Sequence, residues 1–273
     1  MNAAWDRAFP DIIHDSAGRR LMATMRLGSM QITPPWAQDI GTDIDLSALM
    51  VVVESSRLPV ALDLPAGHQP LTDLPKGCWT LERHTRQSTL RTGEDPVESW
   101  PSNRRKQWRR AERAGLTAER TQEVTLMTAL HQAARHRKAI TSDETSLGRL
   151  LTAVLQEQDT HAWIVRGREG DVLVGGVFHG DGSGRCIYGF GGQFREGTQD
   201  STSLATVFLI GHAMRHAVEQ GDTIFDFGGS MDAGVDRFYA EFGAGKVPKT
   251  RVVRITAPLR WLYRLGRPDL FPD

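Results

Sequence analysis

The second half of the chain alternates between helix-type and strand-type hydrophobic patterns. Residues 123–137 and 141–158 place apolar side chains three or four positions apart, which predicts two amphipathic helices. Three short apolar runs follow, separated by glycine-containing turns at 167–170 and 181–184, and this spacing predicts three antiparallel strands joined by tight hairpins. Residues 201–220 return to helical spacing. The predicted order to this point is therefore two helices, three strands and one long helix.

Residues 223–245 form the most informative unit of the chain. Residues 223–227 are a short apolar run, which is typical of a buried strand. Gly228 and Gly229 end the run, because glycine adopts backbone angles that other residues avoid. Apolar residues then recur at helical spacing from 235 to 242, and Gly243 ends that helix. The unit is therefore predicted to be a strand, a sharp turn and a short helix. A last strand at 250–255 and a terminal helix at 258–265 complete the expected order.

The first hundred residues show weaker patterns. Residues 43–53 predict a helix, and residues 59–64 and 79–90 predict strands. Residues 92–102 are acidic and contain one glycine and two prolines, which indicates a join between two parts of the chain. We therefore expect one half at 1–98 and a second half at 99–273. Within the second half, Gly175 and Gly176 predict a bulge or a close approach in the middle strand.

Composition narrows the class of protein. The chain has 273 residues, 40% of them hydrophobic and 24% charged, as in ordinary globular proteins. Its 33 basic and 33 acidic residues balance, so no overall field favours nucleic acid or an anionic membrane. Two cysteines without metal-type spacing indicate neither a disulfide framework nor a metal site, and we expect a cytoplasmic protein. No leader pattern or membrane span is evident in the sequence.

Positive charge concentrates in residues 104–113, which predict a helix that ends at Gly115. Arg105 and Arg109 lie four positions apart and therefore share one face of that helix. Paired guanidinium groups bind phosphate or carboxylate well, so both residues are candidate substrate-binding groups. Two other interpretations stay open, namely a solvated charged face and an RNA-binding surface.

Asp226 is the candidate catalytic residue that the hydrophobic pattern itself identifies. It interrupts a buried apolar run, and a carboxylate in that position needs a partner to offset its desolvation. One interpretation is that it binds the backbone of the following turn. The other is that the strand end and the turn form one wall of a substrate cleft.

Two segments resemble a known family. The segment 226–243 has the pattern D-F-G-G-S followed by G-V-x-R-F-x-x-x-F-G, and the segment 104–115 is similar to R-x-x-I-R-K-A-x-x-x-G. Together they resemble the FemAB-like branch of the GNAT acyltransferase superfamily, over about the last two thirds of the chain. The resemblance implies an α/β (α+β) fold with a mixed, mostly antiparallel sheet flanked by helices. It also implies two GNAT-like halves, of which the first is diverged.

The resemblance also implies the activity. Family members transfer an acyl group to an amine, from acyl-CoA or from aminoacyl-tRNA as co-substrate, with no permanently bound cofactor. We therefore expect an acceptor amine on a peptide, an amino sugar or a small metabolite, and tRNA as a further partner if it carries the donor. Two departures leave the donor open. Residues 195–201 do not match the pyrophosphate loop Q/R-x-x-G-x-G/A, and Tyr239 stands where bridge-forming enzymes carry lysine.

Direct transfer is the simplest mechanism, because no Ser-His-Asp or Cys-His spacing suggests a covalent intermediate. Asp226 would hold the incoming ammonium or accept its proton, and Tyr239 would donate a hydrogen bond. The remaining candidate substrate-binding residues surround the predicted cleft: Arg237, Ser230, Tyr188 and His179. Two alternatives remain for the whole chain, a GNAT-fold binding module without catalysis and an RNA-binding protein that uses residues 104–113.

Overall fold

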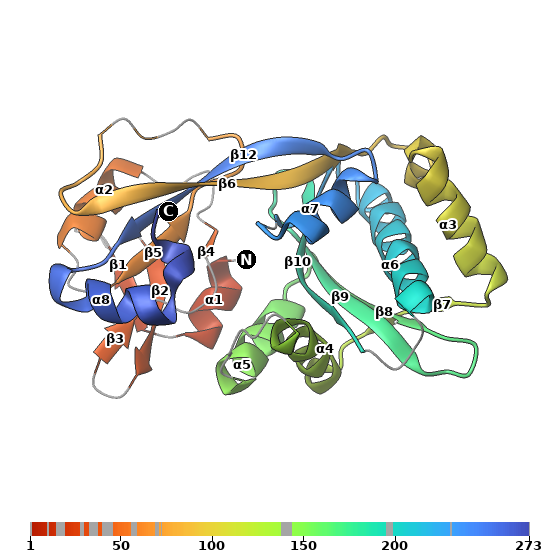
Figure 1. The fold of residues 1–273 in the computed structure, drawn as a ribbon, viewed down its shortest axis with the longest axis horizontal. Coiled ribbons are helices and arrows are strands. Elements are labelled where there is room, and N and C mark those ends of the chain that lie inside the picture. The colour runs from red at the N-terminus through yellow and green to blue at the C-terminus, as the bar shows by residue number, and fades with distance from the viewer. Residues whose placement is uncertain are drawn as a thin grey trace. The chain divides into compact units, whose positions relative to one another are not determined.

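The chain is divided into two compact units. The computed structural model describes every residue except 1, 10, 15–19, 28–29, 33–37, 40–45, 56–58, 69–70, 72, 138–143, 195–198, 230 and 273. One unit is Arg86–Lys246, and the other combines Asn2–Thr85 with Val247–Asp273 (Figure 1). The two halves expected from the sequence, 1–98 and 99–273, remain a prediction, because compactness in space does not identify a duplicated fold.

The unit formed by Asn2–Thr85 and Val247–Asp273 contains two sheets. The small sheet has the antiparallel order β1-β2-β3, and the other places its strands in the order β4-β5-β12-β6. The buried pair of Asp63 and Arg251 joins neighbouring strands β5 and β12. The elements are α1 (Asn2–Ala8), β1 (Asp11–His14), β2 (Arg20–Leu27), β3 (Met30–Ile32), β4 (Gln38–Asp39), α2 (Leu46–Ser55), β5 (Val60–Asp63), β6 (Cys78–Thr89), β12 (Gly245–Arg254), α8 (Ala257–Gly266) and the 3₁₀ turn Pro268–Leu270.

From α4 (Val124–His136) onward, the unit Arg86–Lys246 carries the helix and strand order that the sequence predicts. Its strands lie in the order β6-β11-β10-β9-β8-β7, with the end of β6 pairing to β11. Only β10 and β11 are parallel in this set. The elements are the 3₁₀ turn Pro96–Ser99, α3 (Ser102–Arg113), β7 (Thr117–Thr121), α4 (Val124–His136), α5 (Glu144–Leu155), β8 (Thr160–Arg166), β9 (Val172–Gly180), β10 (Arg185–Gln193), α6 (Gln199–Glu219), β11 (Ile224–Asp226) and α7 (Ala233–Ala240).

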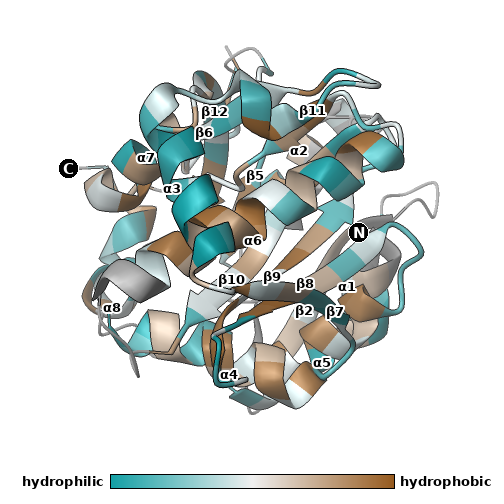
Figure 2. Ribbon diagram, turned by 90° about the vertical axis from the view of Figure 1, so that its right-hand side faces the viewer, coloured by the Kyte–Doolittle hydropathy of each residue, from teal (hydrophilic) through white to brown (hydrophobic). Residues whose placement is uncertain are grey.

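Helices cover both faces of β8, β9 and β10. Helix α6 packs on one face and carries α3 on its outer side, whereas α4 and α5 pack on the other face (Figure 2). The strands are apolar on both faces because both are covered, and β9 is buried from Leu173 to His179. Among the described helices, none combines the length and the hydropathy that crossing a bilayer would require. The mixed, mostly antiparallel α/β fold expected from the sequence is confirmed.

Some local expectations need correction. Strand β7 was not predicted, because residues 117–121 are polar and only partly buried at the sheet edge. Gly175 and Gly176 keep regular pairing with Gly192 and Gly191, and the register shifts lie in β10 between Tyr188 and Phe190 and in the β8–β9 pairing at Val165/Arg166. These two glycines instead allow a close approach, since a Cβ on Gly175 would lie 2.7 Å from the Leu130 side chain.

Helix α3 is fastened to the end of α7 by one buried arginine. The Arg104 side chain donates to the Phe238 carbonyl at 3.0 Å and pairs with Glu241 at 2.9 Å. Its guanidinium also lies over the Phe238 and Phe242 rings, 4.2 and 4.6 Å from their centroids. Burial lowers the pKa of Arg104, and the charge of Glu241 opposes that shift. The most buried arginine of the basic segment is thus structural.

Replacing Arg104 should therefore destabilise the unit Arg86–Lys246. We expect Arg104→Ala to lower the free energy of unfolding by about 2–4 kcal/mol, because packing, a hydrogen bond and an ion pair are lost together. Arg110→Ala, at an exposed position of the same helix, should change it by less than about 0.5 kcal/mol. Urea unfolding followed by circular dichroism measures both. Equal unfolding free energies for the two variants would contradict this role.

Candidate active site

Strands β10 and β11 run side by side for three residues and then part. Their parallel register pairs Arg185 with Ile224, Cys186 with Phe225 and Ile187 with Asp226. Strand β11 ends there, whereas β10 continues to Gln193. Among the described residues, no strand pairs with this edge of β10 beyond Ile187. The peptide groups along that edge therefore have no strand partner beyond Ile187, and the Gln193 carbonyl accepts a hydrogen bond from Arg137 instead.

Glycines allow the two strands to separate. On β10, Gly189 occupies the bulge between Tyr188 and Phe190. After β11, Gly228 and Gly229 adopt φ of 76° and 75°, a region that disfavours other residues. A Cβ on Gly228 would also overlap the Tyr188 carbonyl oxygen. The turn after β11 therefore passes against β10 at one point and then leads the chain away into α7.

A cavity of about 680 Å³ lies where the strands part, a volume within the usual range of small-molecule sites. Its walls come from β9, β10, α4, α6, the turn after β11 and one side of α7. The lining residues are Ala134, Arg137, Val174, Tyr188, Gly191, Gly192, Gln193, Ser203, Thr206, Gly229, Asp232, Gly234, Val235, Phe238 and Tyr239. All of them belong to the unit Arg86–Lys246.

Two of the predicted site residues, Tyr188 and Tyr239, meet in this cavity. Their ring centroids lie 6.5 Å apart; Tyr188 stacks on Phe178 and Tyr239 packs on Phe227. Burial raises the pKa of both phenols, and for Tyr239 the neighbouring Tyr188 adds to the rise. Both hydroxyls therefore stay protonated at neutral pH and can donate hydrogen bonds.

Further polar groups of the cavity were not identified from the sequence. The Asp232 carboxylate caps α7 by accepting hydrogen bonds from the backbone N–H groups of Gly234 and Val235, both at 3.0 Å. Arg137 donates to the Gln193 carbonyl at 2.7 Å. An aspartate just before the apolar positions of a helix is a recognisable cap, so the capping role of Asp232 could have been predicted from the sequence. Arg137 and Gln193 left none, because only the packing of α4 beside β10 brings them together.

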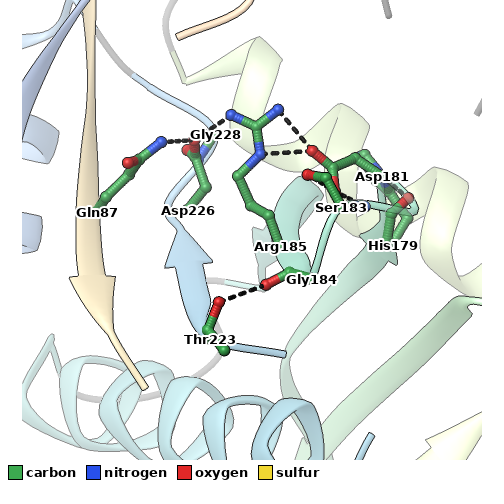
Figure 3. A network of polar contacts seen from close by, with 10 residues as sticks. Gln87, His179, Asp181, Ser183, Gly184, Arg185, Thr223, Asp226 and Gly228 are labelled. Carbon is green, nitrogen blue, oxygen red and sulfur yellow. Dashed lines mark hydrogen bonds and ion pairs between the residues drawn. The ribbon is translucent and has the colours of Figure 1, made fainter. Parts of the chain in front are cut away.

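Asp226 lies beside the cavity rather than among its lining residues. It is only 4% exposed, and its carboxylate accepts hydrogen bonds from Gln87 and from the backbone N–H of Gly228, both at 2.8 Å. Arg185 lies 3.7 Å from it and also binds Asp181, which gives the polar network in Figure 3. The contact with Gly228 fixes the turn that forms the cavity wall.

Four other predicted site residues lie apart from the cavity lining. His179 is buried on β9, with its Nδ1 3.4 Å from the Gly180 carbonyl. Arg237 is exposed on α7, and Arg109 is exposed on α3. Arg105 pairs with Glu98 at 3.5 Å. Ser230 falls outside the described residues, as do four residues of the segment 195–201. The functional roles expected for these residues remain predictions.

The comparisons with known proteins agree with this geometry. A family model described as an acetyltransferase (GNAT) domain matches residues 102–243, which is more than half of the chain. The protein therefore belongs to the GNAT acetyltransferase family. The match includes both segments that carry the sequence resemblance. A search of curated proteins found no match.

Solved structures show the same fold at low sequence identity. FemX is 15% identical with a TM-score of 0.60, and the match covers 93% of this chain and 89% of FemX. The C-terminal domain of a lysylphosphatidylglycerol synthetase, described as putative, from Agrobacterium fabrum is 14% identical, with a TM-score of 0.59 and coverage of 94% and 89%. L-PGS from Bacillus licheniformis is 11% identical, with a TM-score of 0.57 and coverage of 96% and 89%. At these identities the likenesses show a shared fold.

Replacing Gly228 by alanine should destabilise the protein, because this residue lies in close contact with β10. Gly221→Ala serves as the matched control, because Gly221 also has a positive φ of 86° but a Cβ added there would meet no atom within 4 Å. We expect the control to cost about 1 kcal/mol of unfolding free energy and Gly228→Ala at least about 2 kcal/mol more, owing to the overlap with Tyr188. Chemical denaturation measures the difference. Equal losses would show that the turn can move away from β10.

Proposed function

We propose that the protein is an N-acyltransferase that moves an acyl or aminoacyl group directly from a thioester or aminoacyl-tRNA donor to an amine. The reaction takes place in the cavity between β10 and the turn after β11. The single observation that carries this proposal is the early end of the β10–β11 pairing, which leaves a strand edge facing a cavity of about 680 Å³. An extended, amide-containing donor can hydrogen-bond to such an edge as an added strand would.

The position of α6 supports a donor that carries phosphate. Ser203 and Thr206 lie in the first turns of this helix and line the cavity. The N-terminal end of a helix carries partial positive charge, which favours phosphate groups. Both candidate donors, acyl-CoA and aminoacyl-tRNA, contain phosphate, so this feature supports the site without selecting between them.

The two phenols suit the chemistry of acyl transfer. The amine nitrogen attacks the acyl carbon, the new C–N bond forms, and the C–S bond of a thioester or the C–O bond of an aminoacyl ester breaks. The nitrogen loses a proton, and the departing thiolate or ribose oxygen gains one. Tyr239 and Tyr188 stay protonated, so either hydroxyl can stabilise the tetrahedral oxyanion or protonate the leaving group.

Asp226 has two candidate roles in this mechanism. As a base, its carboxylate would take the proton from the incoming amine. As a positioning residue, it would hold the Gly228 turn and thereby the cavity wall. Its contacts with Gln87 and Gly228 and its absence from the lining favour the positioning role. Arg237, His179, Arg105 and Arg109 remain candidate substrate-binding residues, but unlike Tyr188 and Tyr239 they do not line the cavity. Ser230, which lies outside the described residues, also remains a candidate.

Donor binding tests the proposed site. Val235 lines the cavity and Ala233, two residues earlier in α7, is exposed outside the lining, so Val235→Trp and Ala233→Trp form a matched pair. Calorimetry with CoA, acyl-CoA and charged tRNA should show one donor bound by the wild type. Val235→Trp should weaken that binding at least about tenfold by filling the cavity, and Ala233→Trp should retain it.

Two outcomes of the binding experiment would contradict the proposal. Binding of no donor would favour a GNAT-fold module without catalysis, and equal binding by both tryptophan variants would move the donor site elsewhere. Thermal unfolding of each variant separates lost binding from lost folding.

Transfer assays separate the roles of Tyr239 and Asp226. With the identified donor and a panel of amines, Tyr239→Phe should lower kcat by about 10²-fold or more and leave donor affinity unchanged. Asp226→Asn keeps an oxygen that accepts from Gly228 but removes the charge, whereas Asp226→Ala removes both. A positioning role predicts substantial activity for the asparagine variant and loss of activity and stability for the alanine variant.

Equal loss of transfer by both Asp226 variants, with stability kept in the asparagine variant, would instead assign the base role to Asp226. An unchanged kcat for Tyr239→Phe would remove this phenol from the chemistry.

A further inference from the structure

Helix α8 buries only part of its apolar surface. Leu259 and Tyr263, four positions apart, are half-buried against the cluster that contains Val253, Ile255 and Leu270. No residue of α8 is fully buried. The helix is thus attached to its unit along one face, and its opposite side faces outward.

The outward side of α8 carries a stripe of large apolar side chains. Trp261, Leu262 and Leu265 are 67%, 47% and 76% exposed. In the described part of the chain only two other large hydrophobic residues are exposed, Val51 and Met231, and neither belongs to α8. Because residues three and four positions apart share a helix face, the stripe is continuous. Isolated exposed apolar residues are common, but such a grouping indicates an interaction surface.

Arginines flank this stripe on one side. The Arg260 guanidinium lies 5.4 Å from the centre of the Trp79 ring, and the Arg264 guanidinium 5.5 Å from that of Phe271. Both arginines and both aromatic rings line an open groove of about 580 Å³, together with Trp261. Residues 257–267 contain three arginines and no acidic residue, but Arg267 pairs with Asp269 at 2.9 Å, so Arg260 and Arg264 supply the charge beside the stripe. The charge beside the apolar stripe is therefore positive.

We propose that α8 is a docking surface for an anionic phospholipid membrane. An interfacial helix places tryptophan and leucine at the boundary between headgroups and acyl chains and keeps its arginines level with the phosphates. Trp261, Leu262 and Leu265 supply the inserting stripe. Arg260 and Arg264 supply guanidinium groups, which bind phosphate oxygens in pairs.

A second copy of the chain fits this surface less well. A symmetric dimer through α8 would bring the same arginines of both copies close together, and like charges oppose that contact. An anionic bilayer instead complements both the apolar stripe and the arginines. The proposal concerns the unit that contains α8 and is independent of the donor used in the cavity.

Vesicle flotation tests the proposal with the full chain. The protein should float with vesicles of phosphatidylcholine and phosphatidylglycerol at low salt, and far less with phosphatidylcholine alone. The double variant Trp261→Ser/Leu265→Ser should lower the vesicle partition coefficient at least about tenfold. Arg260→Gln/Arg264→Gln should lower it to a similar extent and weaken its salt dependence. Arg110→Gln/Arg113→Gln, which removes two charges from exposed positions of α3, is the matched control and should bind like the wild type.

Several results would overturn the proposal. These are no binding to the anionic vesicles, equal binding by the wild type and both α8 variants, or equal loss in the α3 control. Sedimentation velocity provides a further check: a dimer that Trp261→Ser/Leu265→Ser dissociates, without vesicle binding, would assign this face to a second copy. The replaced side chains are exposed, so each variant should fold, and circular dichroism and thermal unfolding check this.

Discussion

The pairing of β10 with β11 stops after three residues, and the candidate active site depends on that interruption. A longer parallel pair would satisfy the peptide groups of β10 and leave no space for a ligand. Here the chain turns away at Gly228, whose positive φ and lack of a side chain allow it to pass against Tyr188. A gap inside a sheet gives up strand hydrogen bonds. The surrounding elements must therefore hold it open.

Helix α7 lies across the gap from β10. Aromatic packing and the buried Arg104 side chain hold it in place. Phe227 and Phe242 have ring centroids 5.5 Å apart, and Trp100 meets Phe242 edge to face at 4.9 Å. Arg104 adds a hydrogen bond to Phe238 at the end of α7. These contacts join the end of α7 and the residue Phe242 after it to Arg104 of α3 and to Trp100, which precedes α3. They leave Tyr239 and Phe238 facing the space beside β10.

Much of this arrangement could be predicted from the sequence, because it follows from local patterns. The order of helices and strands, the turn after Asp226 and the Gly243 turn that follows α7 all have their own residue signals. Burial could not be predicted in the same way. Neighbouring arginines 104 and 105 look alike in the sequence, yet only Arg104 faces the rings of Phe238 and Phe242. The bulge at Gly189 rather than at Gly175 likewise depends on packing between elements.

Two features of the cavity bear on the departures from the family pattern. Residues 195–201 lack the usual pyrophosphate-loop sequence, but Ser203 and Thr206 in the first turns of α6 line the cavity, and the partial positive charge at a helix N-terminus favours phosphate. Tyr239 replaces a lysine found in bridge-forming enzymes and loses its charge. A phenol that burial keeps protonated nevertheless retains a hydrogen-bond donor at that position. The hydrogen-bond donor of Tyr239 and the helix end next to Ser203 and Thr206 are the two features of the cavity that favour acyl transfer over a binding module without catalysis.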